Sequence, residues 1–597
     1  MHTRAGWRAF TCVTLIGALA LLAGALRATS GERSAQANDP HAAWDALADT
    51  YFDEVYFKFQ PTTGTWAGFH QYDPLLEDYS RAGVERVIAA LHAFEKRIES
   101  FNPDGLNETE AADRQIVLSN IRGTLLELET IRPWEKDPDS YSSGVTVAAY
   151  TIMSRQFAPA DDRLRSVIAR EQAMPAVFAA ARANLKNPPR IYTEIALEQL
   201  PGDIEFFQTA LPQAFSGAKD PGVMAEFEKS NAAVIAAMQS YASWLKSDLL
   251  PRSHGDFRIG AETYSKKLLY DEMVDIPLDR LLEIGRADLH KNQQEFNRIA
   301  REVEPGKNPR QVLAELAADH PAPERLLQTF RDTLDGLVSF IRERHIATIP
   351  SDIRPIVQET PPFERATTFA SMDSPGPFEQ VANEAYFNVT VPDPRDPPQK
   401  VEGLMAQFNY QTIASTAIHE TYPGHYLQYL WLPSTATKVR KILWTNSNEE
   451  GWAHYCEQMM LDEGYGQPSA GSSDARRAKL MRLGQLQDAL LRDARFVVGI
   501  EMHRGRMTFD QAVEFFAREG YQTSEVGLVE AKRGTGDPTY LYYTLGKLEI
   551  LKLRADVQKK QGAAFSLEKF HDDLMRQGRV PLKIVRKAML RDDSPVL

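Results

Sequence analysis

The chain contains almost no cysteine: only Cys12 and Cys456 occur among its 597 residues. Since Cys12 lies in an N-terminal apolar stretch that we expect to be removed, a disulfide within the mature chain is excluded. Stability must then come from a large buried core, for which the chain is long enough. We expect Cys456 to be a small buried apolar side chain rather than a nucleophile.

The sequence also lacks an excess of positive charge and several motifs that would indicate other functions. Its net charge of −13 argues against a general affinity for nucleic acid or anionic lipid. It has no glycine-rich phosphate loop, no clear run of βαβ units and no evident repeat of about 20 to 50 residues. With 43% hydrophobic and 25% charged residues, it is typical of a folded globular protein rather than a disordered one.

The N-terminus has the pattern of a secretory signal. Arg4 and Arg8 precede an apolar stretch over residues 9–26, and Ala35-Gln36-Ala37 then forms a small-x-small cleavage site. We therefore predict a signal peptide over residues 1–37 and a periplasmic or secreted bacterial protein. The alternative is an uncleaved N-terminal anchor. No second long apolar run follows, so no membrane association is expected after cleavage.

Apolar residues recur at helical spacing along most of the mature chain, which predicts a mainly α fold. An N-terminal helical region, residues 38–349, is expected to combine with a C-terminal zinc-site region, residues 350–597, in one compact catalytic unit. Proline- or glycine-containing breaks are expected at 61–68, 102–105 and 188–189. The predicted helices cover residues 41–59, 81–101, 110–131, 161–185, 224–249, 278–303, 324–349, 404–422, 446–463, 475–504, 508–518, 538–559, 566–576 and 581–590.

One segment predicts a β-strand. Residues 385–391 alternate β-branched and aromatic side chains, within a proline-rich stretch that has poor helical periodicity. A strand just before a zinc-binding helix can offer a free edge to a peptide main chain. The alternative is an ordinary strand within a loop.

The most informative motif is His419-Glu420-Thr421-Tyr422-Pro423-Gly424-His425. It pairs two imidazoles, which bind Zn²⁺ well, with a carboxylate beside the first of them. On an unbroken helix the two histidines would lie about 120° apart and roughly 9 Å apart along the axis, too far to share an ion. Pro423 and Gly424 can break the helix, so that His425 turns back beside His419. The alternative is a helix that ends near two unrelated histidines.

A catalytic zinc site usually has three protein ligands and one open position. Glu450 is the best candidate for the third ligand, because a connector and a second helix fit between it and His425. His454 and Glu457 lie on the same face of that helix. Either could orient a metal ligand by a hydrogen bond on the side that faces away from the metal. His454 is also the alternative third ligand.

Hydrolysis further needs a general base and a donor for the oxyanion. Glu420 is positioned to be the base, since it adjoins a ligand without having to bind the metal. Tyr540, Tyr542 and Tyr543 near a helix start are candidate donors, although each could equally be a core tyrosine. His503 and Arg533 are further isolated polar candidates.

These residues resemble domain-of-unknown-function family 885, bacterial proteins placed with the zincin-type metallopeptidases. The resemblance rests on 419–428, 450–457, 537–546 and an N-terminal segment, 61–80, and therefore spans nearly the whole mature chain. It implies a large helical zincin-like metallopeptidase fold with a small β element ahead of the zinc helix. It implies His419, His425 and Glu450 as metal ligands, Glu420 as base and Tyr543 as the transition-state tyrosine.

The chain departs from the family pattern at two places. Many relatives carry leucine where His454 stands, and many have Asp-Thr-Gly before the histidine that matches His503. These departures put a role for His503 in doubt and leave the zinc ligands unchanged.

We therefore expect an exported zinc-dependent peptidase, a hydrolase acting on peptides that are short by analogy with other enclosed helical zincins. The alternatives are a zinc amidase or esterase with a non-peptide substrate, and a catalytically silent helical binding protein.

Overall fold

The described chain is mainly α-helical, as predicted. A computed structural model describes residues 39–361, 365, 368–467 and 475–597, with 72% helix and 3% strand. The predicted signal peptide, 1–37, lies outside the described residues. Within the described part of the chain, no helix is both long and apolar enough to cross a membrane.

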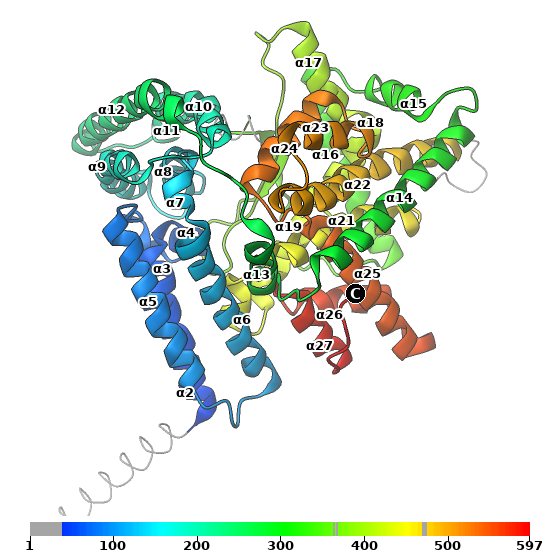
Figure 1. Cartoon of the computed structure of the whole chain (residues 1–597), viewed down its shortest axis with the longest axis horizontal. Coiled ribbons are helices and arrows are strands. Elements are labelled where there is room, and N and C mark those ends of the chain that lie inside the picture. The colour runs from blue at the N-terminus through cyan, green and yellow to red at the C-terminus, as the bar shows by residue number, and fades with distance from the viewer. Residues whose placement is uncertain (1–38, 362–364, 366–367, 468–474) are drawn as a thin grey trace, which may run out of the picture.

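The helices fall into two groups that Figure 1 shows side by side, with the N-terminal group in blue and cyan at the left. Short π-helical turns extend several of the N-terminal helices, at Phe52–Tyr56, Leu126–Ile131, Phe206–Ala210 and Leu245–Leu249. The helices up to the sheet are α2 Pro40–Tyr51, α3 Phe57–Phe59, α4 Pro61–Ala67, α5 Arg81–Ser100, α6 Glu108–Leu125, α7 Pro133–Lys136, α8 Asp139–Met153, α9 Ala160–Asn184, α10 Arg190–Glu205, α11 Leu211–Ala214, α12 Pro221–Trp244, α13 Gly260–Glu272, α14 Leu278–Val303, α15 Pro309–Ala317 and α16 Leu326–Arg344.

The helices after the sheet carry the candidate site and are coloured yellow-green to red in Figure 1. They are α17 Pro398–Met405, α18 Tyr410–Glu420, α19 His425–Trp431, α20 Lys438–Ile442, α21 Asn446–Asp462, α22 Ala475–His503, α23 Phe509–Arg518, α24 Ser524–Gly536, α25 Tyr542–Gln561, α26 Leu567–Met575 and α27 Leu582–Leu590.

Several expected boundaries were wrong. The segment 61–68 is not a break: it forms α4, with Pro61 in its first turn and Gly68 as a left-handed C-cap. The first zinc helix was expected over 404–422, but α18 begins after Asn409, whose side chain accepts hydrogen bonds from the first turn. Helices α8, α10, α13, α15 and α24 were not predicted. In α10 the interior Pro201 conceals the helical pattern, and in α24 three glycines do so.

The predicted strand is present as β3, Tyr386–Val389, but its expected free edge is not. The sheet order is β1-β3-β2, with β1 at Ile356–Glu359 and β2 at Ala370–Asp373. β3 is therefore the central strand, parallel to β1 and antiparallel to β2. The interpretation of this segment as an open edge was wrong, because both of its sides are already hydrogen-bonded. The outer strand near α18 is β2, which contacts that helix.

Three large buried apolar clusters and one small one, made up of Ala414, Leu461 and Met481, form the core of the described residues. The first joins α2–α6 to the helices around the candidate site, and includes Cys456, which is buried as expected. The second lies between α13, α14 and α22–α25, and the third within α8–α12. Buried polar contacts also tie the N-terminal helices to the later ones, as between Asp113 and Arg440 at 2.7 Å. The candidate site is thus fixed by packing from both halves of the chain.

Candidate metal centre

The chain breaks between the two histidines of the predicted motif. Helix α18 ends at Glu420 and α19 begins at His425, so His419 lies in the last turn of one helix and His425 at the start of the next. Gly424 permits the tight return, because a Cβ there would lie 1.9 Å from the carbonyl oxygen of His419. The two imidazole rings meet edge to face, with centroids 4.8 Å apart. The predicted helix break is present and brings the two rings together.

Helix α21 brings the third candidate ligand to the histidines. Glu450 Oε2 lies 3.2 Å from His419 Nε2 and 3.4 Å from His425 Nε2. The same helix holds the break in place, since the Trp452 indole N–H donates to the carbonyl oxygen of Pro423 at 2.9 Å. One helix therefore supplies both the candidate ligand and the support for the loop between the histidines.

A glycine contact sets α21 against α25. A Cβ on Gly546 would lie 1.8 Å from the carbonyl oxygen of Ser447, and one on Gly451 would lie 2.5 Å from the Cα of Gly546. Because the two helices approach this closely, Glu450, next to Gly451, and Tyr543, one turn before Gly546, reach the same site. This contact explains why glycine occurs in both motifs.

The geometry of the three side chains fits a tetrahedral divalent ion. Ligand atoms about 2.0–2.1 Å from a tetrahedral zinc lie about 3.3–3.4 Å from one another. Glu450 Oε2 lies at nearly these distances from the two imidazole nitrogens, 3.2 and 3.4 Å. The ligand atoms of His419, His425 and Glu450 all lie within 4.8 Å of one another. Glu450 Oε2 is buried and no hydrogen bond from the described residues satisfies it. Two nitrogens and one carboxylate oxygen are a donor set that suits catalytic zinc.

The electrostatics of the cluster favour a cation at the same point. Burial alone would raise the pKa of Glu450, but the two histidines bring it well below its ordinary value. Burial would lower the pKa of His419, yet Glu450 and Glu457 raise it to about 9. Positive charge between these groups, whether a proton or a metal ion, is therefore stabilised.

Glu457 lies on the side of His419 that faces away from Glu450. It has the orienting role that was expected for either His454 or Glu457. It accepts a hydrogen bond from His419 Nδ1 at 2.7 Å and pairs with Arg492 at 3.0 Å. This contact orients the imidazole so that Nε2 points toward Glu450 and His425. His454 contacts only Glu457 in this group, at 3.1 Å, and is not part of the three-residue set.

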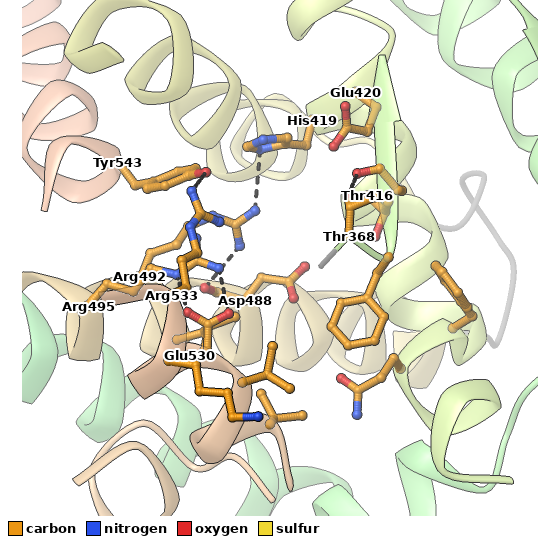
Figure 2. Close-up of a pocket in the computed structure, with 18 of the residues that line it drawn as sticks. Thr368, Thr416, His419, Glu420, Asp488, Arg492, Arg495, Glu530, Arg533 and Tyr543 are labelled. Atoms are coloured by element: carbon orange, nitrogen blue, oxygen red, sulfur yellow. Dashed lines mark hydrogen bonds and ion pairs between the residues drawn. The ribbon is translucent and has the colours of Figure 1, made fainter. Parts of the chain in front are cut away.

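Glu420, the predicted base, lines a cavity of about 450 Å³ together with His419 and Tyr543. Figure 2 shows Glu420 beside His419 at the upper edge of this cavity, with Tyr543 across from it. Burial raises the pKa of Glu420 despite the two neighbouring histidines. A buried carboxylate with a raised pKa, beside a cation site, is suited to accept a proton from water.

Of the three candidate tyrosines, Tyr543 alone lines this cavity. Its ring stacks on His419 with centroids 6.3 Å apart, and Arg533 donates to its hydroxyl oxygen at 3.0 Å. Burial raises its pKa to about 12, so the hydroxyl keeps its proton and can donate it. Tyr542 donates to Asp537 instead, at 2.6 Å, and Tyr540 is fully buried.

The structure separates the two remaining polar candidates. Arg533 lines the cavity, whereas His503 lies outside it. His503 Nε2 donates to the carbonyl oxygen of Gly534 at 2.8 Å, and burial lowers the pKa of this histidine to about 4. His503 is therefore a neutral histidine that holds the end of α24.

The charged floor of the cavity was not predicted from the sequence. Arg492 and Arg495 on α22 and Glu530 on α24 line it, and the two arginines and Arg533 surround the Tyr543 ring at 4.8–5.6 Å. Charged residues one turn apart on one helix face, Asp488, Arg492 and Arg495, were the available signal. The carboxylate partner of Arg495 came from α24, a helix that the sequence did not predict.

Comparison with known proteins agrees with this architecture. A family model described as "Bacterial protein of unknown function (DUF885)" matches residues 61–589. A protein proposed to be a lipoprotein, of unknown function, from Shewanella oneidensis has a similar structure, with TM-score 0.74 and 26% identity over 92% of this chain and 99% of that one. A proposed lipoprotein from Colwellia psychrerythraea has TM-score 0.75 and 18% identity, over 92% and 98% of the two chains. No curated protein matches the chain. The description of the Shewanella protein supports an exported or envelope location.

Proposed function

This chain belongs to the family described as bacterial protein of unknown function (DUF885), and we propose that it is a zinc-dependent peptidase of the periplasm or cell exterior. The observation that carries the proposal is the convergence of His419, His425 and Glu450 on one point, beside a carboxylate that needs no place in the metal set. A binding protein would need the three ligands but no base such as Glu420.

In the proposed mechanism Glu420 and Tyr543 each have one task, and Arg533 orients Tyr543. When bound by His419, His425 and Glu450, zinc would act as a Lewis acid that polarises the substrate carbonyl and activates water. Glu420 takes the proton from the attacking water and delivers it to the leaving amine. Tyr543 donates its hydroxyl hydrogen to the oxyanion that develops on the carbonyl. Because Arg533 donates to the Tyr543 oxygen, that hydrogen is directed away from Arg533.

The small sheet supports a peptide as substrate. Ala370, the first residue of β2, lines the cavity together with Thr368 and Phe369 just before the strand. β2 is an outer strand of the sheet. An extended peptide could add to this edge by main-chain hydrogen bonds, which a small non-peptide amide could not do.

The test is digestion of a mixed peptide library, read by mass spectrometry, with chelator, without it, and after zinc is restored. We expect cleavage that chelator abolishes and zinc recovers. Glu420→Gln is the matched control: it should retain zinc and lose turnover about 10²- to 10⁴-fold.

Two other results would replace the proposal. Hydrolysis of small amides or esters without any peptide cleavage would favour a zinc amidase or esterase. Bound peptides that stay intact with full zinc occupancy would favour a silent binding protein. Near-normal turnover by Glu420→Gln would remove the base assignment.

A further inference from the structure

Four cationic side chains line the cavity beside the metal centre, and three of them are neutralised by close carboxylates. Arg495 forms a two-pronged pair with Glu530, at 2.6 and 2.7 Å. Arg492 pairs with Glu457 at 3.0 Å, and Lys532 pairs with Glu198 at 2.6 Å. These three cations have little charge left to offer a ligand.

Arg533, the fourth cation, is paired only weakly. Among the described residues, Asp537 provides the one carboxylate within 4.0 Å of its guanidinium, and it lies 3.4 Å away. That carboxylate already accepts a shorter hydrogen bond, 2.6 Å, from Tyr542. The side chain of Arg533 is 36% exposed, compared with 9% for Arg495 and 12% for Arg492. Its charge is therefore the most available one in the cavity.

Arg533 is also close to the reacting centre. Its Nη2 donates to the hydroxyl oxygen of Tyr543, whose ring stacks on the candidate ligand His419. Figure 2 shows Arg533 in the middle of the cavity, between Tyr543 and the Arg495–Glu530 pair. A group bound by Arg533 would thus be separated from the metal centre only by the Tyr543 side chain.

Apolar side chains also line the cavity. They are Ile195, Phe369, Phe408, Leu491, Val526 and Val529. Phe369 and Val529 remain 38% exposed, so this part of the lining presents open apolar surface. A cavity of about 450 Å³ with one open cation and an apolar wall suits a short ligand that has a carboxylate and an apolar side chain.

We propose that Arg533 binds the α-carboxylate of a peptide substrate, so that the enzyme removes residues from free C-termini, with preference for apolar ones. The inference rests on the proposed peptidase function and adds the substrate class. The carboxylate forms charged hydrogen bonds with the guanidinium and takes no part in the reaction, in which water adds across the amide bond. An acidic side chain within a peptide offers the same chemistry, so the test must separate these two sources.

The test uses three peptides of one apolar sequence: the free acid, its C-terminal amide, and an amide with glutamate as last residue. Binding is measured by calorimetry to the zinc-loaded Glu420→Gln variant, which does not consume the peptide, and cleavage to the wild-type enzyme. We expect the free acid to bind and react about 10- to 100-fold better than its amide. The glutamate amide should behave like the plain amide.

Two substitutions locate the effect. Arg533→Gln should reduce the ratio between acid and amide to near one, in binding as well as in cleavage. Arg533→Lys should restore part of the ratio, because it retains the charge without the planar fork. Lys532→Gln is the matched control, a neighbouring cation of the same cavity that is already paired, and it should retain the ratio.

The outcomes separate this inference from the function on which it rests. Equal use of acid and amide, or an acid preference that persists in Arg533→Gln, would overturn the inference and leave the peptidase intact. A preference for the glutamate amide over the free acid would transfer the Arg533 site to acidic side chains. Failure of the protein to bind or cleave any of the three peptides would overturn both.

Discussion

Two buried polar clusters lie close together, both at the helix that carries Glu450 and His454, and they differ in whether hydrogen bonds complete them. The closed cluster consists of Asp288, Asn292, Asp493, Thr544 and Lys547. Within it, Lys547 donates to Asp288 at 2.7 Å, while Asn292 and Thr544 donate to the two oxygens of Asp493 at 2.7 and 2.8 Å. Both carboxylates thus accept hydrogen bonds from within the cluster.

The open cluster consists of His419, His425 and Glu450. Two imidazole nitrogens face the same carboxylate oxygen, and Glu450 Oε2 and His425 Nδ1 are buried without a hydrogen bond from the described residues. A buried polar group without a partner costs about 1–3 kcal/mol. The comparison teaches that burial of charge alone does not single out a candidate metal site, whereas the convergence of three ligand-type atoms on one point does.

Removal of a ligand from the open cluster should have the largest effect. Glu450→Gln replaces a charged ligand by a neutral amide, and we expect zinc affinity to fall about a thousandfold, since roughly 10–16 kcal/mol of binding is shared among the ligands of a zinc site. Zinc content after dialysis and competition with a chromophoric chelator measure the change.

Glu449→Gln is the control for this change. Glu449 adjoins Glu450 but pairs with Arg579 at 2.7 Å, and its substitution should leave the zinc content intact. Full zinc content in Glu450→Gln would mean that another residue is the third ligand, with His454 the first to test.

The closed cluster should respond in stability rather than in metal content. Lys547 is 1% exposed, and it brings the pKa of Asp288 below its ordinary value although burial raises it. Lys547→Met leaves Asp288 as an unpaired buried charge, so we expect the free energy of unfolding to fall by about 3 kcal/mol or more. Urea unfolding followed by circular dichroism measures it, and the folded protein should retain its zinc.

A second substitution sharpens the comparison. Asp288→Asn combined with Lys547→Met removes both charges and should recover much of the lost stability. If Lys547→Met instead loses zinc while its stability holds, the two clusters act as one and the distinction fails.

The parts of the site that the sequence predicted are those with a local cause. Pro423 and Gly424 cannot continue a helix, so the turn that brings His425 to His419 follows from adjacent residues. Glu450 could be chosen because it lies 25 residues after His425, which leaves room for a connector and a second helix that folds back on the first. The long amphipathic helices, such as α14 and α16, were likewise predicted near their observed bounds.

The parts that were missed depend on distant contacts. The position of β3 at the centre of its sheet is set by pairing with β1 and β2, which nothing within residues 385–391 encodes. Helix α24 has three glycines. At one of them, Gly534, a Cβ would lie 2.3 Å from the hydroxyl oxygen of Tyr540, so the close approach of this tyrosine requires glycine. Tertiary packing overrides the low helix propensity of this segment. The weak pairing of Arg533 became visible only once its neighbours were in place.

The smallest expected effect concerns Glu457, which touches the open cluster without belonging to it. Glu457 is fully buried, accepts from His419 Nδ1 at 2.7 Å and pairs with Arg492 at 3.0 Å. Glu457→Gln keeps the shape but removes the charge that orients His419 and increases its basicity, so zinc affinity should fall about 10- to 100-fold. His454→Leu is the control, because His454 contacts Glu457 at 3.1 Å but no candidate ligand. It should leave zinc affinity unchanged.

A loss in Glu457→Gln as large as that in Glu450→Gln would extend the open cluster to a fourth residue. No loss of zinc affinity would mean that Arg492 and packing alone hold His419 in place.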